Sequence, residues 1–368
     1  MPSSLKEGAD WFLIIPTNYN LKLQNKTSCP LIANCDIIHM VMNVSNRFNW
    51  AILGCGNIAN DFAREMNKMG GKVYSVANRT YEKAVDFAKK YEIEKVYENI
   101  DDIFVDENVD IVYIATPHNK HIEYILKALQ NNKHVLCEKA ITLNSDELNK
   151  AVNLANEKNL ILAEAMTIYN MPLYTELEKI ISSGKLGNFR LAQVNFGSFK
   201  EYDMTNRFFN MDLAGGALLD IGVYALSCVR MFMTEYPDDI KSQVKFAVTG
   251  ADEQSNIILK NSKDELASVT LSLHAKQPKR ATICYDKGYI EIFEYPRADS
   301  ATIYYTEDNS TEKIKAGDIN NALCYEIENM ENAIISGKNT MRLNYTIDVM
   351  NIMTTLRNDW GMKYPEEK

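Results

Sequence analysis

From residue 50 onward, short apolar runs alternate with longer segments whose apolar residues fall on one helical face. Tyr81–Tyr91 is one such segment, and the segment with Ile122, Ile125 and Leu129 is another. Continuous apolar runs are typical of strands covered on both faces of a parallel sheet, with the helices as crossovers. We therefore predict strands at Trp50–Leu53, Val73–Ala77, Asp110–Ala115, His134–Cys137 and Leu160–Ala163.

The pattern changes after about residue 167. A helix with Leu173, Leu177 and Ile180 on one face ends at Gly184, and extended segments then follow one another without helices between them. Strands in direct succession predict an antiparallel sheet. We expect these strands at residues 189–199, 243–249, 255–260, 266–274, 280–285, 289–294 and 301–305, and helices again around Leu323–Ile334 and Val349–Leu356.

The 368 residues exceed the ~250–300 residues at which a single core stops growing, so we predict two domains. The fold class is α/β, with a parallel-sheet domain over residues 47–167 and an α+β domain over residues 168–368. Residues 1–46 lack this periodicity. We expect them to be either a poorly ordered extension or the result of a start codon assigned upstream of Met40 and Met42, and assign them no function.

The first apolar run leads directly into Gly54-Cys55-Gly56-Asn57-Ile58-Ala59. In a strand-turn-helix, the first glycine permits the turn, the second lets backbone amides approach a pyrophosphate, and a small third residue lets helix and strand pack closely. A plain turn is the alternative. The position predicts a Rossmann dinucleotide-binding domain, with Gly54, Gly56, Asn57 and Ile58 at the cofactor.

The end of the second predicted strand indicates which cofactor binds. A carboxylate there would accept the ribose hydroxyls of NAD(H), but no acid occurs between residues 72 and 81, where the chain reads Asn78-Arg79. A guanidinium can pair with a 2′-phosphate and stack on adenine. We therefore predict NADP(H) rather than NAD(H), with Asn78 and Arg79 at the phosphate. The alternative is that Arg79 is a solvated charge at a helix start.

Composition excludes several other functions. The 40 basic and 49 acidic residues leave a net charge of −9, and no Lys/Arg stripe occurs, so nucleic acid is not an expected partner. No apolar run reaches the ~20 residues that span a bilayer, so we expect no membrane partner and a cytoplasmic location. The 7 cysteines show no Cys-x-x-Cys spacing and are expected to be free thiols. His118 and His121 have no further ligand at metal spacing, so no zinc is predicted.

Further motifs lie at predicted strand ends. They are Ala115–His121, Cys137–Ala140, Glu164–Met166 followed by Pro172, and Gly215–Tyr224. Together with the glycine-rich turn, and in this order over about residues 48–360, the set resembles the Gfo/Idh/MocA oxidoreductase family. Arg207–Phe209 and Ala217–Tyr224 look most like its dimeric dihydrodiol dehydrogenase and sugar dehydrogenase branch.

This resemblance implies a nicotinamide-dependent dehydrogenase or reductase whose small-molecule substrate is a sugar, polyol or related hydroxyl/carbonyl compound. It also implies an open, mainly antiparallel sheet in the second domain that binds substrate and forms a homodimer or higher homo-oligomer. Family members place a lysine, an acid and a His or Tyr around the nicotinamide, which here are Lys139, Asp220 and Tyr224. We expect Thr116, Pro117, His118, His121 and Glu138 to contact the cofactor, together with Lys139.

The residue chemistry agrees with these roles. Asp220 and Tyr224 are four apart and share a face if helical. Tyr224 is the predicted acid/base, Lys139 lowers its pKa and orients the substrate, and Asp220 orients by hydrogen bonding. Arg207 contacts the substrate or is surface charge.

Each of these residues also has a purely structural interpretation. Lys139 can be an exposed loop lysine, Asp220 a helix-start residue and Tyr224 a core residue. His121 either touches the nicotinamide end or caps its helix.

Two departures from the family pattern matter. Ala140 stands where the family has proline. A cis bond before a non-proline residue costs ~2.5–4 kcal/mol, so we predict a trans Lys139-Ala140 peptide. Thr167–Met171 replaces the usual aromatic, Arg and His residues on the substrate side, which indicates a different substrate. The alternatives are an NADP-binding regulatory protein without turnover, and a reductase of a non-sugar carbonyl or a trans-dihydrodiol.

Overall fold

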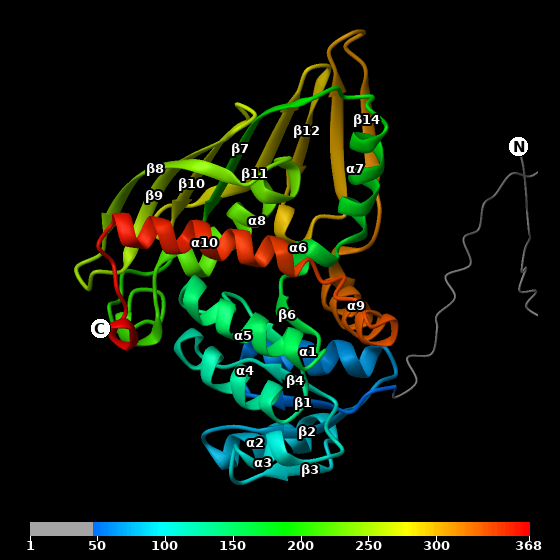
Figure 1. The fold of residues 1–368 in the computed structure, drawn as a ribbon, viewed down its shortest axis with the longest axis vertical. Helices are drawn as coiled ribbons and strands as arrows, with labels where there is room; N and C mark the ends of the chain where they lie inside the picture. Colours follow the sequence, from blue (N-terminus) through cyan, green and yellow to red (C-terminus); the bar gives the residue numbers. More distant parts are fainter. Residues whose placement is uncertain (1–46) are drawn as a thin grey trace, which may run out of the picture. The chain divides into compact units, whose positions relative to one another are not determined.

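The structure, a computed structural model, describes residues 47–368, so the expectations for residues 1–46 lie outside the described residues. Two sheets dominate it: a six-stranded sheet in the order β3-β2-β1-β4-β5-β6 and an eight-stranded sheet in the order β14-β13-β12-β11-β7-β10-β9-β8 (Figure 1). We refer to them as sheet A and sheet B. The predicted α/β class is confirmed, because sheet A is parallel throughout and is flanked by helices.

Sheet A has the strand order of a Rossmann fold. Its central strand alternates between two cores: Trp50 and Ile52 belong to one hydrophobic cluster, and Ala51 and Leu53 to the other. This period-two alternation buries both faces, which explains why the strand sequences are continuously apolar. The strands are β1 (Trp50–Leu53), β2 (Val73–Ala77), β3 (Lys95–Tyr97), β4 (Ile111–Ile114), β5 (His134–Glu138) and β6 (Leu162–Ala165).

Helices cover sheet A on both faces. Phe62 of α1 and Phe87 of α2 join the cluster of Trp50, whereas Ile125 of α4 and Leu148 of α5 join the other cluster. The helix α9 of the C-terminal half also packs on the first face, through Ile327 and Met330. The first five helices are α1 (Asn57–Lys68), α2 (Tyr81–Tyr91), α3 (Asp102–Val105), α4 (His121–Gln130) and α5 (Ser145–Glu157).

Sheet B is antiparallel except where β7 and β10 pair in parallel. One face is apolar and packs on α8, with Val194 and Val269 among its buried residues. Its strands are β7 (Phe189–Gly197), β8 (Pro237–Phe246), β9 (Asp252–Asn261), β10 (Leu266–Ser272), β11 (Gln277–Tyr285), β12 (Gly288–Phe293), β13 (Ser300–Tyr305) and β14 (Thr311–Lys315).

The remaining helices connect the two sheets. In Figure 1, α10 runs between the sheet B side and α5, and it contacts both α8 and α5. A five-residue π-helical turn, Leu218–Gly222, leads into α8. These helices are α6 (Thr167–Asn170), α7 (Pro172–Ser182), α8 (Val223–Phe232), α9 (Ala322–Ser336) and α10 (Leu343–Asp359).

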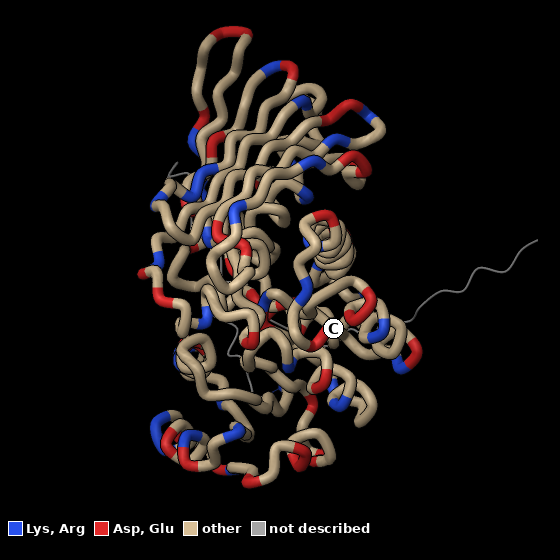
Figure 2. The backbone as a smooth tube through the Cα atoms, turned by 90° about the vertical axis from the view of Figure 1, so that its left-hand side faces the viewer, with Lys and Arg blue, Asp and Glu red and all other residues tan. Residues whose placement is uncertain are grey.

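One segment of the described chain, Met211–Phe232, is long and apolar enough to cross a membrane, with a mean hydropathy of 1.4. Its most apolar window is 78% buried, because α8 packs against β7 and α10. Figure 2 shows acidic and basic residues interspersed along the chain rather than gathered in a basic stripe.

The sequence missed short or polar elements and shifted the strands β6 and β8, the latter predicted at residues 243–249. The strands β3 and β14 and the helix α3 were not predicted, because three or four residues carry too little periodicity and the edge strand β14 has charged residues at three of its five positions. The strand β6 begins at Leu162 because the Leu160 amide donates to the Ala155 carbonyl and closes α5. The predicted division at residue 167 stays a prediction.

Candidate active site

The turn after β1 has the geometry that the glycine motif predicts. Gly54 adopts φ +106°, and a Cβ there would lie 2.4 Å from the Ala115 carbonyl oxygen, so only glycine fits. A Cβ on Gly56 would meet nothing within 4 Å, because this residue faces open space. No side chain caps the N-terminus of α1. The turn and the uncapped amides therefore fit a dinucleotide pyrophosphate.

A cavity of about 580 Å³ lies against this turn. It brings together the N-terminus of α1, the loop after β4, the end of β5 and the N-terminus of α8, which are far apart in the sequence. Ten of the predicted site residues line it: Gly56, Asn57, Ile58, Thr116, Pro117, His118, Glu138, Lys139, Arg207 and Tyr224. We call this space the nicotinamide cavity, and Ala115 and Leu213 complete its lining.

The Lys139-Ala140 peptide is cis, so the predicted trans bond is wrong. Two histidines contact the carbonyl oxygens of the two residues that form this peptide. The His118 Nε2 lies 3.0 Å from the Lys139 oxygen, and the His121 Nδ1 lies 2.9 Å from the Ala140 oxygen. The following amide, of Ile141, donates to a Glu164 carboxylate oxygen at 3.1 Å. The prediction of a trans bond used only local preferences, which do not include these tertiary hydrogen bonds.

Lys139 and Asp220 form a buried pair at the cavity wall. The Lys139 ammonium donates to the Asp220 backbone oxygen at 2.6 Å and lies 3.3 Å from its Oδ1. Arg207 places a guanidinium nitrogen 3.5 Å from the same carboxylate oxygen. The lysine is thus directed into the site and is not an exposed loop residue. Asp220 does not itself line the cavity but positions the groups that do.

The charges of this pair favour each other. Burial acts to raise the pKa of Asp220, but Lys139 and Arg207 outweigh it and lower the pKa. Burial acts to lower the pKa of Lys139, but Asp220 and Tyr224 outweigh it and raise the pKa. At neutral pH the cavity wall therefore carries an ammonium and a carboxylate.

Tyr224 lies beside this pair, with its ring centre 5.1 Å from the Lys139 Nζ. Burial raises the pKa of its phenol, and the positive charge of Lys139 only partly offsets this. Lys139 thus lowers the Tyr224 pKa, as predicted, but the net shift is upward because desolvation outweighs the nearby cation. At neutral pH the hydroxyl keeps its proton.

The two histidines differ in placement. His118 lines the cavity, and burial together with His121 and Lys139 lowers its pKa to about 3, so it is neutral. His121 is fully buried, with its ring nitrogens 2.9 Å from the Ala140 oxygen and 2.8 Å from the Thr116 oxygen. Its side chain neither lines the cavity nor caps the helix α4, so it acts as a brace between two loops of the site.

The remaining predicted residues lie outside the cavity. The Asn78 side chain donates to the Thr80 oxygen at 2.9 Å, and Arg79 is exposed at the end of β2, without a hydrogen bond or ion pair to any of residues 47–368. Gly54 does not line the cavity, because it packs against the Ala115 carbonyl within the turn. Leu213, whose side chain helps to close the cavity, was missed because no motif marks it.

Within residues 47–368, no group of three His, Cys, Asp or Glu side chains could hold a metal ion. The cysteines of this part, Cys55, Cys137, Cys228, Cys284 and Cys324, are free. Burial raises the pKa of Cys55, beside the glycines, to about 12, which makes it an unreactive thiol.

Comparison with known proteins gives matches along most of the chain. Residues 48–166 match the Gfo/Idh/MocA model described as an oxidoreductase family with a NAD-binding Rossmann fold, and residues 174–291 match the Gfo/Idh/MocA C-terminal domain. The trans-1,2-dihydrobenzene-1,2-diol dehydrogenase of Xenopus tropicalis is 28% identical over 328 residues, which cover 86% of this chain and 99% of that protein. The Mus musculus enzyme is 31% identical over 249 residues, which cover 66% of this chain and 74% of that protein.

Solved structures share the fold. Levoglucosan dehydrogenase in complex with NADH and levoglucosan superposes with a TM-score of 0.78 at 17% identity, covering 85% of this chain and 97% of that one. The 3-ketoreductase KijD10 of Actinomadura kijaniata, in complex with NADP and TDP-benzene, has a TM-score of 0.72 at 20% identity, covering 84% and 95%.

Proposed function

Since the chain belongs to the Gfo/Idh/MocA family of oxidoreductases, we propose that it is an NADP-dependent dehydrogenase or reductase of a sugar, polyol or related hydroxyl/carbonyl compound. Lys139, Asp220 and Tyr224 meet at one wall of the cavity that the glycine-rich turn also lines. This juxtaposition carries the proposal, because it places proton-transfer groups beside the site that fits the dinucleotide.

Arg79 supports NADP(H) over NAD(H). It is exposed at the end of β2, and an acidic residue that would repel a 2′-phosphate is absent from residues 72–81. Among proteins of similar fold, KijD10 is described with NADP and levoglucosan dehydrogenase with NADH. The preference for NADP(H) therefore rests on Arg79, with Asn78 beside it.

The bound nicotinamide supplies the hydride acceptor or donor. The protein moves the proton: in carbonyl reduction, the Tyr224 hydroxyl donates to the substrate oxygen, and in alcohol oxidation the Tyr224 phenolate accepts the hydroxyl proton. The Lys139 ammonium hydrogen-bonds the reacting oxygen and favours the phenolate. Asp220 holds Lys139 in place through its backbone and carboxylate oxygens.

Arg207 is the candidate substrate contact on the solvent side. Its guanidinium carbon lies 4.1 Å from the Phe208 ring centre, and its side chain is 57% exposed. It lines the nicotinamide cavity, where a substrate hydroxyl can accept its remaining hydrogen bonds.

A trans-dihydrodiol is the second candidate substrate. The curated relatives with 28% to 31% identity are trans-1,2-dihydrobenzene-1,2-diol dehydrogenases, whereas levoglucosan dehydrogenase and the 3-ketoreductase of similar fold share 17% to 21% identity. Phe196 and Tyr224, 6.4 Å apart between ring centres, offer aromatic surface beside the site.

We further propose a cytoplasmic homo-oligomer that associates through sheet B. Its outward face carries the exposed side chains Ile258 and Phe293, at 55% and 54% exposure. Apolar side chains on an open sheet face favour association with a second copy.

The test is steady-state turnover of sugars, polyols and a trans-dihydrodiol with NADP and with NAD. We expect turnover with NADP and a rise of ~10–100-fold in its KM for Arg79→Ala, since a guanidinium-phosphate pair contributes about 1.5–3 kcal/mol. The KM for NAD should not change, and Lys89→Ala on the following helix, α2, serves as the control. A KM for NADP that is the same in Arg79→Ala as in the wild type would reject NADP specificity. Cofactor binding without any turnover would support the regulatory alternative.

A further inference from the structure

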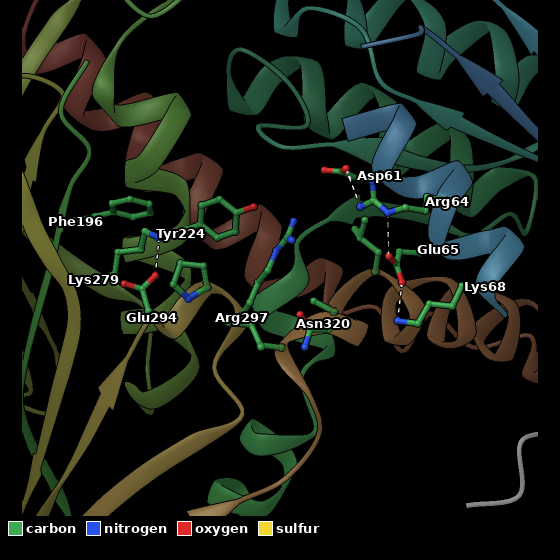
Figure 3. A pocket seen from close by; sticks show the side chains of 14 residues that line it. Asp61, Arg64, Glu65, Lys68, Phe196, Tyr224, Lys279, Glu294, Arg297 and Asn320 are labelled. Carbon is green, nitrogen blue, oxygen red and sulfur yellow. Dashed lines mark hydrogen bonds and ion pairs between the residues drawn. The ribbon is translucent and has the colours of Figure 1, made fainter. Parts of the chain in front are cut away.

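A second cavity, of about 700 Å³, opens on the other side of Tyr224. It lies between α1, the face of sheet B and the loops around Pro296 and Asn320 (Figure 3). Tyr224, the proposed acid/base, lines both this cavity and the nicotinamide cavity. We call the second space the distal cavity.

Three of the four cations that line the distal cavity are already paired. Arg64 binds Asp61 at 2.9 Å and Lys68 binds Glu65 at 3.1 Å, both along α1. Lys279 binds Glu294 across sheet B at 2.6 Å. Dashed lines in Figure 3 mark these contacts. These cations are therefore neutralised by the protein itself.

Arg297 is the exception. Its guanidinium makes no ion pair and no hydrogen bond with any of residues 47–368, although the side chain is partly buried. In Figure 3 its guanidinium lies between the Tyr224 hydroxyl and the charged side chains of α1. Its positive charge also acts to lower the pKa values of Tyr224, Glu138 and Glu326.

The backbone that carries Arg297 is held in place. Its amide donates to the Glu294 oxygen at 3.0 Å. The preceding carbonyls accept from Thr167 Oγ1 at 2.9 Å and from Tyr174 Oη at 2.5 Å, through Pro296 and Tyr295 respectively. A guanidinium on a fixed loop is preorganised, which lowers the entropic cost of binding a ligand.

The carboxyl group of Glu326 forms no hydrogen bond or ion pair with Arg297. Glu326 is fully buried on α9, and neither of its carboxyl oxygens has a hydrogen-bond partner in the described chain. Burial raises the pKa of this carboxyl well above its usual range, which favours its neutral form. Arg297 thus keeps its positive charge facing the cavity.

The rest of the lining suits a carbon skeleton. The apolar part of the cavity wall consists of Phe196, Pro296, Ile319 and Leu323. The distal cavity thus offers apolar contacts and an unpaired guanidinium beside Tyr224.

We propose that the substrate carries an anionic group, a carboxylate or a phosphate, which Arg297 binds in the distal cavity while the reacting carbon lies beside Tyr224. This inference rests on the proposed function, because it specifies the substrate of the same site. A guanidinium binds either group through two parallel hydrogen bonds, and neutral sugars lack this contact.

The test compares three probes with one ring: D-glucose, D-glucuronate and D-glucose 6-phosphate. Binding is measured by calorimetry on the full chain loaded with NADPH, in which a sugar cannot be oxidised. We expect at least one anionic probe to bind ~10–100-fold more tightly than glucose, with an advantage that decreases as salt is added. The anionic probe that binds more tightly shows whether the site prefers a carboxylate or a phosphate.

Variants assign the preference to Arg297. Arg297→Gln should remove the ~10–100-fold advantage and leave glucose binding unchanged, and Arg297→Lys should retain part of it because it keeps the charge but loses the planar fork. Arg190→Gln, on β7 and paired with Asp286, removes a distant positive charge and serves as the control. Unchanged melting temperatures show that the variants fold.

The outcomes separate the inference from the proposed function. Equal binding of all three probes, no binding of any, or an anion preference that survives Arg297→Gln would overturn the inference. Turnover of neutral substrates without an anion preference would leave the proposed function standing. An Arg297-dependent preference without turnover of any probe or panel compound would support the anion site and reject the enzymatic function.

Discussion

The Lys139 ammonium donates a 2.6 Å hydrogen bond to the backbone oxygen of Asp220 and lies 3.3 Å from its carboxylate. The contact joins the end of β5 in sheet A to the π-helical turn before α8. One side chain thus links the dinucleotide-binding half to the half that carries Tyr224. The proposed proton transfer depends on this link.

Replacing Lys139 with methionine should lower kcat/KM by ~10²–10⁴-fold, because the reacting oxygen loses its charged hydrogen-bond donor. Cofactor binding, followed by nicotinamide fluorescence, should change far less, since the glycine-rich turn is untouched. Lys120→Met, at an exposed lysine, is the control. Turnover within tenfold of wild type in Lys139→Met would contradict the assigned role.

Asp220→Asn should lower the free energy of unfolding by about 3–5 kcal/mol at pH 7, because it leaves the Lys139 charge buried without its partner. The pKa of Asp220 is lowered in the folded protein, so its stabilisation is present above the unfolded pKa of ~3.9 and is lost as pH falls through the folded pKa.

Urea unfolding of wild type and Asp220→Asn between pH 3.5 and 7 checks this. The difference between them should be full above about pH 5 and should shrink below about pH 4. The exposed Asp212, as Asp212→Asn, is the control. A difference independent of pH would mean that the Asp220 charge does not stabilise the fold.

The raised pKa of Tyr224 predicts different pH dependences for the two reaction directions. Carbonyl reduction needs the protonated phenol and should stay constant from pH 6 to about 9, whereas alcohol oxidation needs the phenolate and should rise with pH over this range. Tyr224→Phe should lose ~10²–10⁴-fold in kcat and abolish the rise, and Tyr81→Phe on α2 should do neither. A rise that persists in Tyr224→Phe would assign the base to another group.

The two glycines of the turn should fail in different ways. Gly54→Ala should lower the melting temperature, because its φ of +106° and the 2.4 Å approach to Ala115 leave no room for Cβ. Gly56→Ala should melt like wild type without cofactor but bind NADP at least tenfold more weakly, since its Cβ would enter the space for the pyrophosphate. Equal melting temperatures for both variants would be inconsistent with this geometry.

Local pattern was sufficient for the long elements. The helix predicted at Tyr81–Tyr91 has those same bounds in the structure, and the first strand is likewise observed at Trp50–Leu53. Both carry a full apolar face or run, so local spacing and burial agree. The edge strand β14 was missed because an exposed strand needs no apolar residues.

The site was predictable as a set of residues and not as an arrangement. The motifs identified Lys139, Asp220 and Tyr224 one by one, but the cis Lys139-Ala140 peptide is held by His118 and His121 from another loop. Arg297 follows an ordinary Tyr-Pro sequence, so nothing local marks it as a cation without a partner.

The sequence by itself determined the α/β class and the glycine-rich turn, because both depend on neighbours within a few positions, and the family resemblance identified Lys139, Asp220 and Tyr224. The tertiary structure decided the ionisation of Tyr224, the brace formed by His121 and the free charge of Arg297. These properties depend on desolvation and on partners many residues away, and chain folding alone brings those groups together.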